Sequence, residues 1–209
     1  MKSLVIAATV ALGLVVAAPA MAATQPVPVQ GTKASVDAWT QQAKSRDMRV
    51  STRFNLGEGF EIDCGVTGSG ASDCARVDMN PGGSDATQEI QVGKKRWVRD
   101  IPGGAWTEID GYASQNAVGN VSRYWSYDPF EPWNAKKGVT WNMKTKANGD
   151  VVITSTVANP GDDEPKKTRV AISPNGLHFS ITAKAEDGNR LWRTTGELVD
   201  GIVVTAPTS

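Results

Sequence analysis

The single histidine, His178, is the side chain best suited to acid–base chemistry, and its surroundings argue against that use. It shares the alternating face of its strand with Ser180, Thr182 and Lys184, so we expect it to be exposed. The sequence has no histidine cluster, no G-x-S-x-G motif and no phosphate-binding glycine loop. Its carboxylates are scattered, and spacing alone cannot pair two of them as acid and base. We therefore expect a protein that is not an enzyme; the alternative is a secreted hydrolase whose residues meet only in the fold.

The two cysteines, Cys64 and Cys74, flank a short stretch rich in glycine and serine. Two cysteines in an exported chain most often pair, and closing so short a loop contributes about 2–3 kcal/mol in the chain-entropy model. A redox pair is usually spaced as C-x-x-C, and two thiols without nearby histidines make a poor metal site. We predict a structural disulfide, with no metal and no cofactor.

Charge is balanced, with 22 basic and 22 acidic residues. Because there is no basic stripe, a nucleic-acid partner is not expected. Three neighbouring acidic residues, Asp162, Asp163 and Glu164, could suggest calcium, but a solvated loop is the commoner explanation. Charge therefore points to no particular ligand.

The N-terminus has the pattern of an export signal. Lys2 precedes an apolar run from Leu4 to Val16, and Ala20-Met21-Ala22 is a small-x-small cleavage site. We predict a signal peptide over residues 1–22, a flexible lead-in over 23–32 and one domain over 33–209; the alternative is an uncleaved anchor helix. No cysteine lies at the cleavage site, so we expect no N-terminal lipid. We expect an exported monomer in the periplasm, cell envelope or extracellular space.

The elements that would position these residues are mostly strands. Thr32 or Ser35 can cap a short helix that runs through Lys44. Alternation then predicts two strands whose apolar faces are Met48, Val50, Thr52 and Phe54, and Phe60, Ile62, Cys64 and Val66. In the next strand Ala75, Val77 and Met79 have the pattern of the core face, which would put Cys74 opposite to Cys64 unless a bulge intervenes.

The stretch from Thr87 to Asp110 predicts three strands joined by tight turns. Ile90 and Val92 alternate with polar neighbours, and Trp97, Arg99 and Ile101 fall on one face after the turn at Gly93. Pro102-Gly103-Gly104 supplies the next turn, and the chain returns through Trp106. We expect Trp97 and Trp106 to lie on one face and to be substantially buried.

Strands resume after residue 138 and continue to the C-terminus, with turns such as Asn148-Gly149 and Asp200-Gly201. The total is ten to a dozen short strands, mostly joined by hairpins, which predicts an antiparallel sheet. One short helix cannot cover both faces of so long a sheet, so the sheet must close or curl into a trough with apolar walls.

Residues 111–133 form a long aromatic insert between strands, interrupted by Pro129 and Pro132. It is expected to act as a lid over an apolar cavity or as a permanently packed plug. Any one of the seven tryptophans could simply fill a core, whereas the aromatic set as a whole suggests a binding cavity. The candidate ligand-binding residues are Trp97, Trp106, Tyr124, Trp125, Tyr127, Phe130, Trp133 and Trp141.

Two groups of motifs resemble a known family. The segment K-R-W-V-R followed by P-G-G-A-W is similar to a hairpin of exported LolA-like and LppX/LprG-like carriers, and S-P-N-G-L-H-F-S-I-T, D-G-N-R and D-G-I-V-V-T-A-P are similar to their C-terminal run. The resemblance implies an antiparallel half-barrel with short helices over its concave face and a cavity for acyl chains. Its implied partners are a lipid or an acylated protein, with a membrane-associated donor or acceptor. The absent lipid-anchor cysteine and the Cys64–Cys74 pair depart from it.

A second class of function is an extracellular β-domain that binds carbohydrate or protein through surface tryptophans. The two classes differ in tryptophan exposure, because a cavity buries these side chains while a sugar platform leaves them accessible to a quencher.

Overall fold

The computed structural model describes residues 25–55, 59–78, 86–109, 139–158, 160 and 165–208. The predicted signal peptide, the acidic loop at 162–164 and the aromatic segment 111–133 lie outside the described residues. Within the described ranges no helix is long and apolar enough to cross a membrane.

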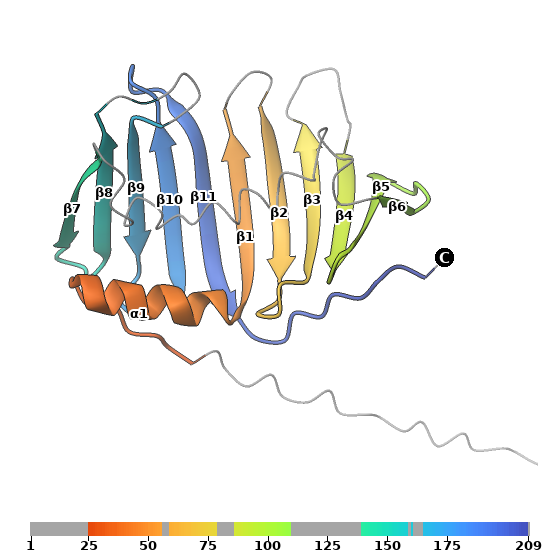
Figure 1. Cartoon of the computed structure of the whole chain (residues 1–209), viewed down its shortest axis with the longest axis horizontal. Coiled ribbons are helices and arrows are strands. Elements are labelled where there is room, and N and C mark those ends of the chain that lie inside the picture. The colour runs from red at the N-terminus through yellow and green to blue at the C-terminus, as the bar shows by residue number, and fades with distance from the viewer. Residues whose placement is uncertain are drawn as a thin grey trace, which may run out of the picture.

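One helix and eleven strands are described, and the strands form a single sheet (Figure 1). In chain order these are α1 (Lys33–Lys44), β1 (Asp47–Phe54), β2 (Phe60–Val66), β3 (Ser72–Asp78), β4 (Ala86–Val92), β5 (Lys95–Ile101), β6 (Thr107–Ile109), β7 (Val139–Thr145), β8 (Val151–Val157), β9 (Lys167–Ile172), β10 (His178–Lys184) and β11 (Arg190–Val199). The strand order is β6-β5-β4-β3-β2-β1-β11-β10-β9-β8-β7, with every pair antiparallel. The sheet is open, so the predicted antiparallel, incomplete barrel is confirmed.

Helix α1 begins and ends where its capping residues predict. Thr32 has extended backbone angles and its hydroxyl accepts a hydrogen bond from the Ser35 amide, while the backbone of Ser45 closes the last turn. The buried face of α1 consists of Val36, Trp39, Thr40 and Ala43. Figure 1 shows the helix lying across one end of the strands from β7 to β11.

Residues 25–31, which belong to the lead-in predicted over 23–32, lie against the sheet. Val27 and Val29 are both buried in the core. Their amides donate hydrogen bonds to the carbonyls of Asn175 (2.8 Å) and Pro174 (3.3 Å) in the turn before β10. Two apolar side chains and two backbone hydrogen bonds hold this segment against the sheet. The proline-rich sequence did not predict these contacts.

The two faces of the sheet differ in character. We call the side on which α1 packs the inner face and the opposite side the outer face. A first core cluster joins α1 and residues 27–29 to inner-face side chains of β1 and β8–β11; its members are Val27, Val29, Val36, Trp39, Ala43, Met48, Val50, Val151, Ile153, Val170, Ile172, Phe179, Ile181 and Leu198. The predicted core faces of the first two strands are confirmed, because Val50 and Cys64 are direct partners on this side.

Cys64 and Cys74 form a disulfide between directly opposed residues of β2 and β3 on the inner face. The pairing of β2 with β3 is regular throughout, so the expected core face of β3 was wrong. Ala75 and Val77 point to the outer face, where Val77 is 49% exposed. The disulfide and the regular register together place both cysteines on the inner face, and they place Ala75 and Val77 on the outer face.

The disulfide is expected to be formed in exported protein and to stabilise the fold modestly. Its two cysteines are ten residues apart, so the double substitution C64S/C74S should lower the free energy of unfolding by about 2–3 kcal/mol while the far-ultraviolet β signal is retained. Thiol labelling of denatured, unreduced protein checks the first statement, and urea unfolding checks the second. Two reactive thiols in natively exported material would contradict the prediction.

The part of the Thr87–Asp110 stretch that the structure describes, up to Ile109, folds as predicted into β4, β5 and β6. The turn between β5 and β6 follows a cis Ile101–Pro102 bond, and Gly103 adopts a φ of 86°, which suits glycine. Register places Trp97 opposite Ile90 and Arg99 opposite Gln88, so Trp97, Arg99 and Ile101 share the outer face. The inner face of β4 and β5 therefore carries the intervening residues, which are polar except for Val98.

Candidate functional site

A second apolar cluster lies on the inner face over β1, β2 and β3, and its members are strand residues. Phe54, Ile62, Cys64 and Cys74 are buried, and Phe60, Val66 and Trp192 pack around them while remaining half-buried. Phe54 and Phe60 stack with their ring centroids 4.5 Å apart. This cluster extends the apolar inner face beyond the strands that α1 crosses.

One side of the second cluster ends in charged residues of β3. The guanidinium of Arg76 lies 4.2 Å from the centroid of the Phe60 ring and its Nε donates to Asp78 (2.9 Å). A cation held over an aromatic face in this way gains about 0.5–1 kcal/mol at an exposed site. The apolar surface is therefore bounded by charge on the side nearest β4.

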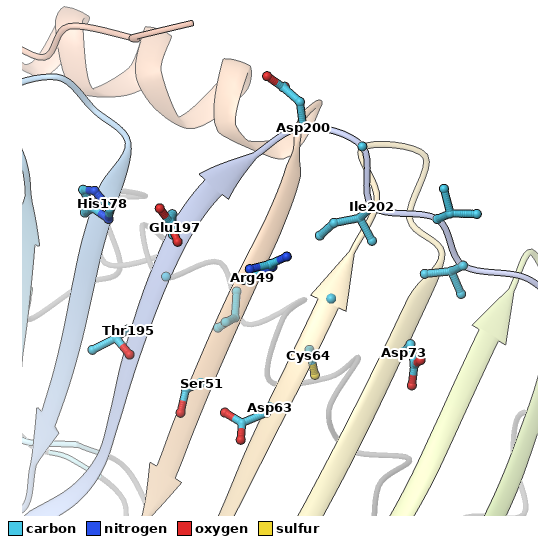
Figure 2. A pocket seen from close by; sticks show the side chains of 16 residues that line it. Arg49, Ser51, Asp63, Cys64, Asp73, His178, Thr195, Glu197, Asp200 and Ile202 are labelled. Atoms are coloured by element: carbon cyan, nitrogen blue, oxygen red, sulfur yellow. The ribbon is translucent and has the colours of Figure 1, made fainter. Parts of the chain in front are cut away.

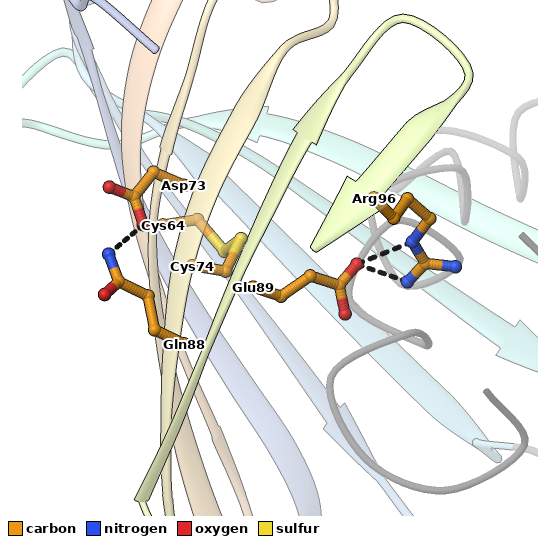
Figure 3. Close-up of a disulfide and its surroundings, with 6 residues drawn as sticks. All are labelled: Cys64, Asp73, Cys74, Gln88, Glu89 and Arg96. Atoms are coloured by element: carbon orange, nitrogen blue, oxygen red, sulfur yellow. Dashed lines mark hydrogen bonds and ion pairs between the residues drawn. A yellow bond between two sulfur atoms is a disulfide. The ribbon is translucent and has the colours of Figure 1, made fainter. Parts of the chain in front are cut away.

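A buried ion pair occupies the inner face of β4 and β5 (Figure 3). Glu89 lies directly opposite Cys74, and Arg96 reaches it diagonally from β5. The side chains of Glu89 and Arg96 are 6% and 8% exposed, and Nε of Arg96 donates to Oε1 of Glu89 at 2.8 Å. The second guanidinium nitrogen, Nη2, donates to the same oxygen.

Burial raises the pKa of Glu89, and the hydrogen bond and charge of Arg96 oppose that rise. Removing a carboxylate from water penalises its charged form, while a neighbouring cation favours it. Without Arg96 the ionised carboxylate would thus have no compensating charge among its described contacts.

The outer face carries a groove of about 800 Å³ between the sheet and residues 200–204 (Figure 2). A cross-strand row forms its floor, running from His178 through Glu197 and Arg49 to Gly65 and Asp73. Ile202 packs at Gly65, where a Cβ would lie 3.5 Å from its Cγ2. The absence of a side chain at Gly65 thus leaves room for the chain that borders the groove.

The charged groups of the groove have both signs. Asp63, Asp73, Glu197 and Asp200 line it together with Arg49 and His178. His178 is exposed, as predicted. None of the described residues lining the groove is a tryptophan. Within the described chain, no group of three or more His, Cys, Asp or Glu residues could hold a metal ion.

The predicted site residues fall into different places. Trp97 and Trp106 are both half-buried on the outer face, where Arg99 lies 4.5 Å from the centroid of the Trp106 ring. The Trp141 backbone lies in edge strand β7, opposite Ser155. The aromatic candidates of the insert, which are Tyr124, Trp125, Tyr127, Phe130 and Trp133, lie outside the described residues.

A polar network supports the outer-face tryptophan. Gln88 donates to Asp73 through Nε2 (2.7 Å) and accepts two hydrogen bonds from Arg99. Arg99 is thereby held over Trp106. These contacts make Trp106 part of a local structural arrangement on the side of the sheet opposite the second cluster.

The residues that sequence reasoning missed are those of the inner face. Phe54, Phe60 and Ile62 were expected in the core but were not proposed as site residues. Trp192 belongs to the same cluster, and its register opposite Phe54 joins the last strand to the first. Alternation could identify each face separately, but it could not show that these two strands are neighbours.

No family model and no curated protein matches the chain. Similar solved structures include an uncharacterized conserved protein from Thermus thermophilus, with 8% identity over 81% of this chain and 88% of that one and a TM-score of 0.43. LprF from Mycobacterium bovis has 10% identity over 83% and 95%, with a TM-score of 0.38. A putative outer membrane lipoprotein-sorting protein domain from Vibrio parahaemolyticus has 10% identity over 78% and 89%, with a TM-score of 0.29. At these values the likenesses carry no functional argument.

Proposed function

We propose that this chain is an exported protein that binds the acyl chains of lipids or acylated proteins on the inner face of its sheet. The proposal assigns it a carrier role and no catalytic role. The predicted export signal and the Cys64–Cys74 disulfide support a location outside the reducing cytosol.

The observation that carries the proposal is the second apolar cluster. The first cluster contains the buried apolar residues of α1, whereas the second consists of described strand residues; Val66 and Trp192 pack against both. Phe60, Val66 and Trp192 remain half-buried at its margin. The apolar inner face thus continues past the strands that α1 crosses, with Phe54, Ile62, Cys64 and Cys74 buried there. Apolar side chains of this kind hold a hydrocarbon chain without directional contacts.

Loss of the Trp192 side chain is expected to weaken acyl binding. Removing about 50 Å² of apolar contact at roughly 25 cal/mol per Å² corresponds to about a tenfold loss of affinity. W192A should therefore bind labelled methyl laurate about tenfold more weakly than the wild type in equilibrium dialysis. The matched control is W106A, a half-buried tryptophan of the outer face, for which the affinity should be unchanged.

Mass spectrometry of lipids that copurify with natively exported protein provides the complementary test. The proposal expects acyl lipids at near-stoichiometric amounts and their reduction in W192A. A lipid-free protein that also fails to bind methyl laurate would refute it, as would equal losses in W192A and W106A, because the outer face would then take part.

A further inference from the structure

Two buried oxygens on the inner face have no hydrogen-bond partner. Among the described residues, these are Oγ1 of Thr87 and Oε2 of Glu89. They lie two residues apart in β4, so both side chains point to the same face with their Cα atoms about 7 Å apart. Buried polar atoms without partners are uncommon in folded proteins, and each needs a physical explanation.

The neighbours of these oxygens define an amphiphilic arrangement. Glu89 is opposite Cys74, a member of the second apolar cluster, and Thr87 is opposite Arg76, which contacts Phe60. Apolar side chains thus adjoin two polar atoms along neighbouring strands of one face. Figure 3 shows Glu89 directing one oxygen to Arg96 while its other oxygen takes part in no marked interaction.

The chemistry of the two oxygens restricts what can satisfy them. Oε2 of the ionised Glu89 is an acceptor and needs a donor, whereas the Thr87 hydroxyl can donate or accept. Glu89 and Arg96 already neutralise each other. An added amine would bring an uncompensated positive charge into a buried site, and an added acid would bring a second negative charge beside Glu89.

We infer that Thr87 and Glu89 bind the hydroxyl groups of a neutral amphiphile whose acyl chain lies on the second apolar cluster. This inference rests on the proposed function and adds its head-group selectivity. Arg96 acts as a positioning residue, because both of its hydrogen bonds go to Oε1 and leave Oε2 unpaired. The arrangement favours a glycerol-type head group over a carboxylate, an ammonium or a simple ester.

Monolauroylglycerol and methyl laurate provide the test, because they share an acyl chain and differ in two hydroxyl groups. The wild-type protein should bind monolauroylglycerol about three- to tenfold more tightly, the range expected for one or two neutral hydrogen bonds. T87V keeps the side-chain volume and removes the hydroxyl, so it should reduce this preference. E89Q replaces the acceptor by an amide and should reduce the preference too.

The matched control is T182V, the same substitution at a half-buried position on the outer face of β10, which should keep the preference. T87V should be at least as stable as the wild type in thermal unfolding, because it removes an unpaired buried hydroxyl. Equal binding of both esters, an unchanged preference in T87V, or tighter binding of laurate or dodecylamine would overturn the inference alone. Failure of both esters to bind would overturn the proposed function and the inference with it.

Discussion

Replacement of Trp39 by alanine is expected to lower the free energy of unfolding by about 3–5 kcal/mol, the range for truncating a buried tryptophan. Trp39 is 2% exposed and packs edge-to-face on Phe179, with 5.8 Å between the ring centroids. Its Nε1 donates a hydrogen bond to the carbonyl of Gly176 at 2.8 Å. Truncation removes these contacts and leaves that carbonyl without its indole donor.

The turn that receives Trp39 has no spare room. Gly176 has a φ of 68°, and a Cβ there would lie 1.9 Å from the Val27 carbonyl and 2.8 Å from Trp39 Nε1. The turn, residues 25–31 and α1 thus meet around one side chain. Removing the indole therefore leaves a cavity between three separate segments, which cannot collapse without moving backbone.

Urea unfolding followed by circular dichroism measures the effect of W39A. W39F retains most of the apolar contact and loses the hydrogen bond, so it should lose about 1–2 kcal/mol. W106A is the control, because a half-buried tryptophan beneath a guanidinium should cost about 1 kcal/mol or less. A loss in W39A no greater than in W106A would show that α1 contributes little to the stability of the sheet.

Local patterns were sufficient for the elements whose partners follow directly in the chain. A cap at Thr32 or Ser35, the end of α1 near Lys44 and the core faces of β1 and β2 could all be predicted, because capping and alternation are properties of neighbouring residues. The three-stranded unit around Gly93 and Pro102 was predicted for the same reason. Turn chemistry fixes such a register over a few residues.

The core face of β3 could not be predicted, because alternation points to the more apolar face and the inner face of this strand carries Arg76 and Asp78 beside Cys74. Ala75 and Val77 provide the apolar pattern, yet Cys74 is the residue held inside by its bond to Cys64. A one-residue change of register exchanges the two faces completely. The disulfide and its register therefore outweighed the hydrophobicity of two modest side chains.

The candidate site depended on pairings between distant segments. Strand β1 pairs with β11, so Phe54 lies opposite Trp192 although most of the chain separates the two residues in sequence. Glu89 alternates with the apolar Ile90 and therefore has the pattern of a solvent-facing residue, but both are buried. Arg96, the partner of Glu89, can be identified only once the pairing of β4 with β5 is known. Alternation of apolar and polar residues cannot predict two adjacent residues of one strand that are both buried, on opposite faces, when one of them is charged.

Replacement of Arg96 by methionine is the second large effect, and it is expected to cost about 3–5 kcal/mol near neutral pH. Methionine preserves much of the apolar stem but removes both hydrogen bonds to Glu89. Breaking a buried ion pair from one side leaves an uncompensated charge, which is the origin of a loss of this size. K95M is the matched control, since Lys95 is the adjacent residue and forms an ion pair with Glu108 at the surface. The side chains of Lys95 and Glu108 are 65% and 53% exposed. That surface substitution should change stability by about 0.5 kcal/mol or less.

The loss in R96M should depend on pH in a defined direction. Burial already raises the pKa of Glu89, and removal of Arg96 removes the two influences that oppose the rise. A carboxyl group whose pKa is higher in the folded state stabilises the fold below its unfolded-state pKa, and that contribution is lost as the pH rises through the folded-state value. The difference between wild type and R96M should therefore grow from about pH 5 to pH 8 in urea unfolding. Because E89Q/R96M lacks both charges, it should recover most of the stability and lose the pH dependence of R96M. A pH-independent loss in R96M, or no recovery in the double variant, would show that Arg96 stabilises the sheet through its packing rather than through its charge.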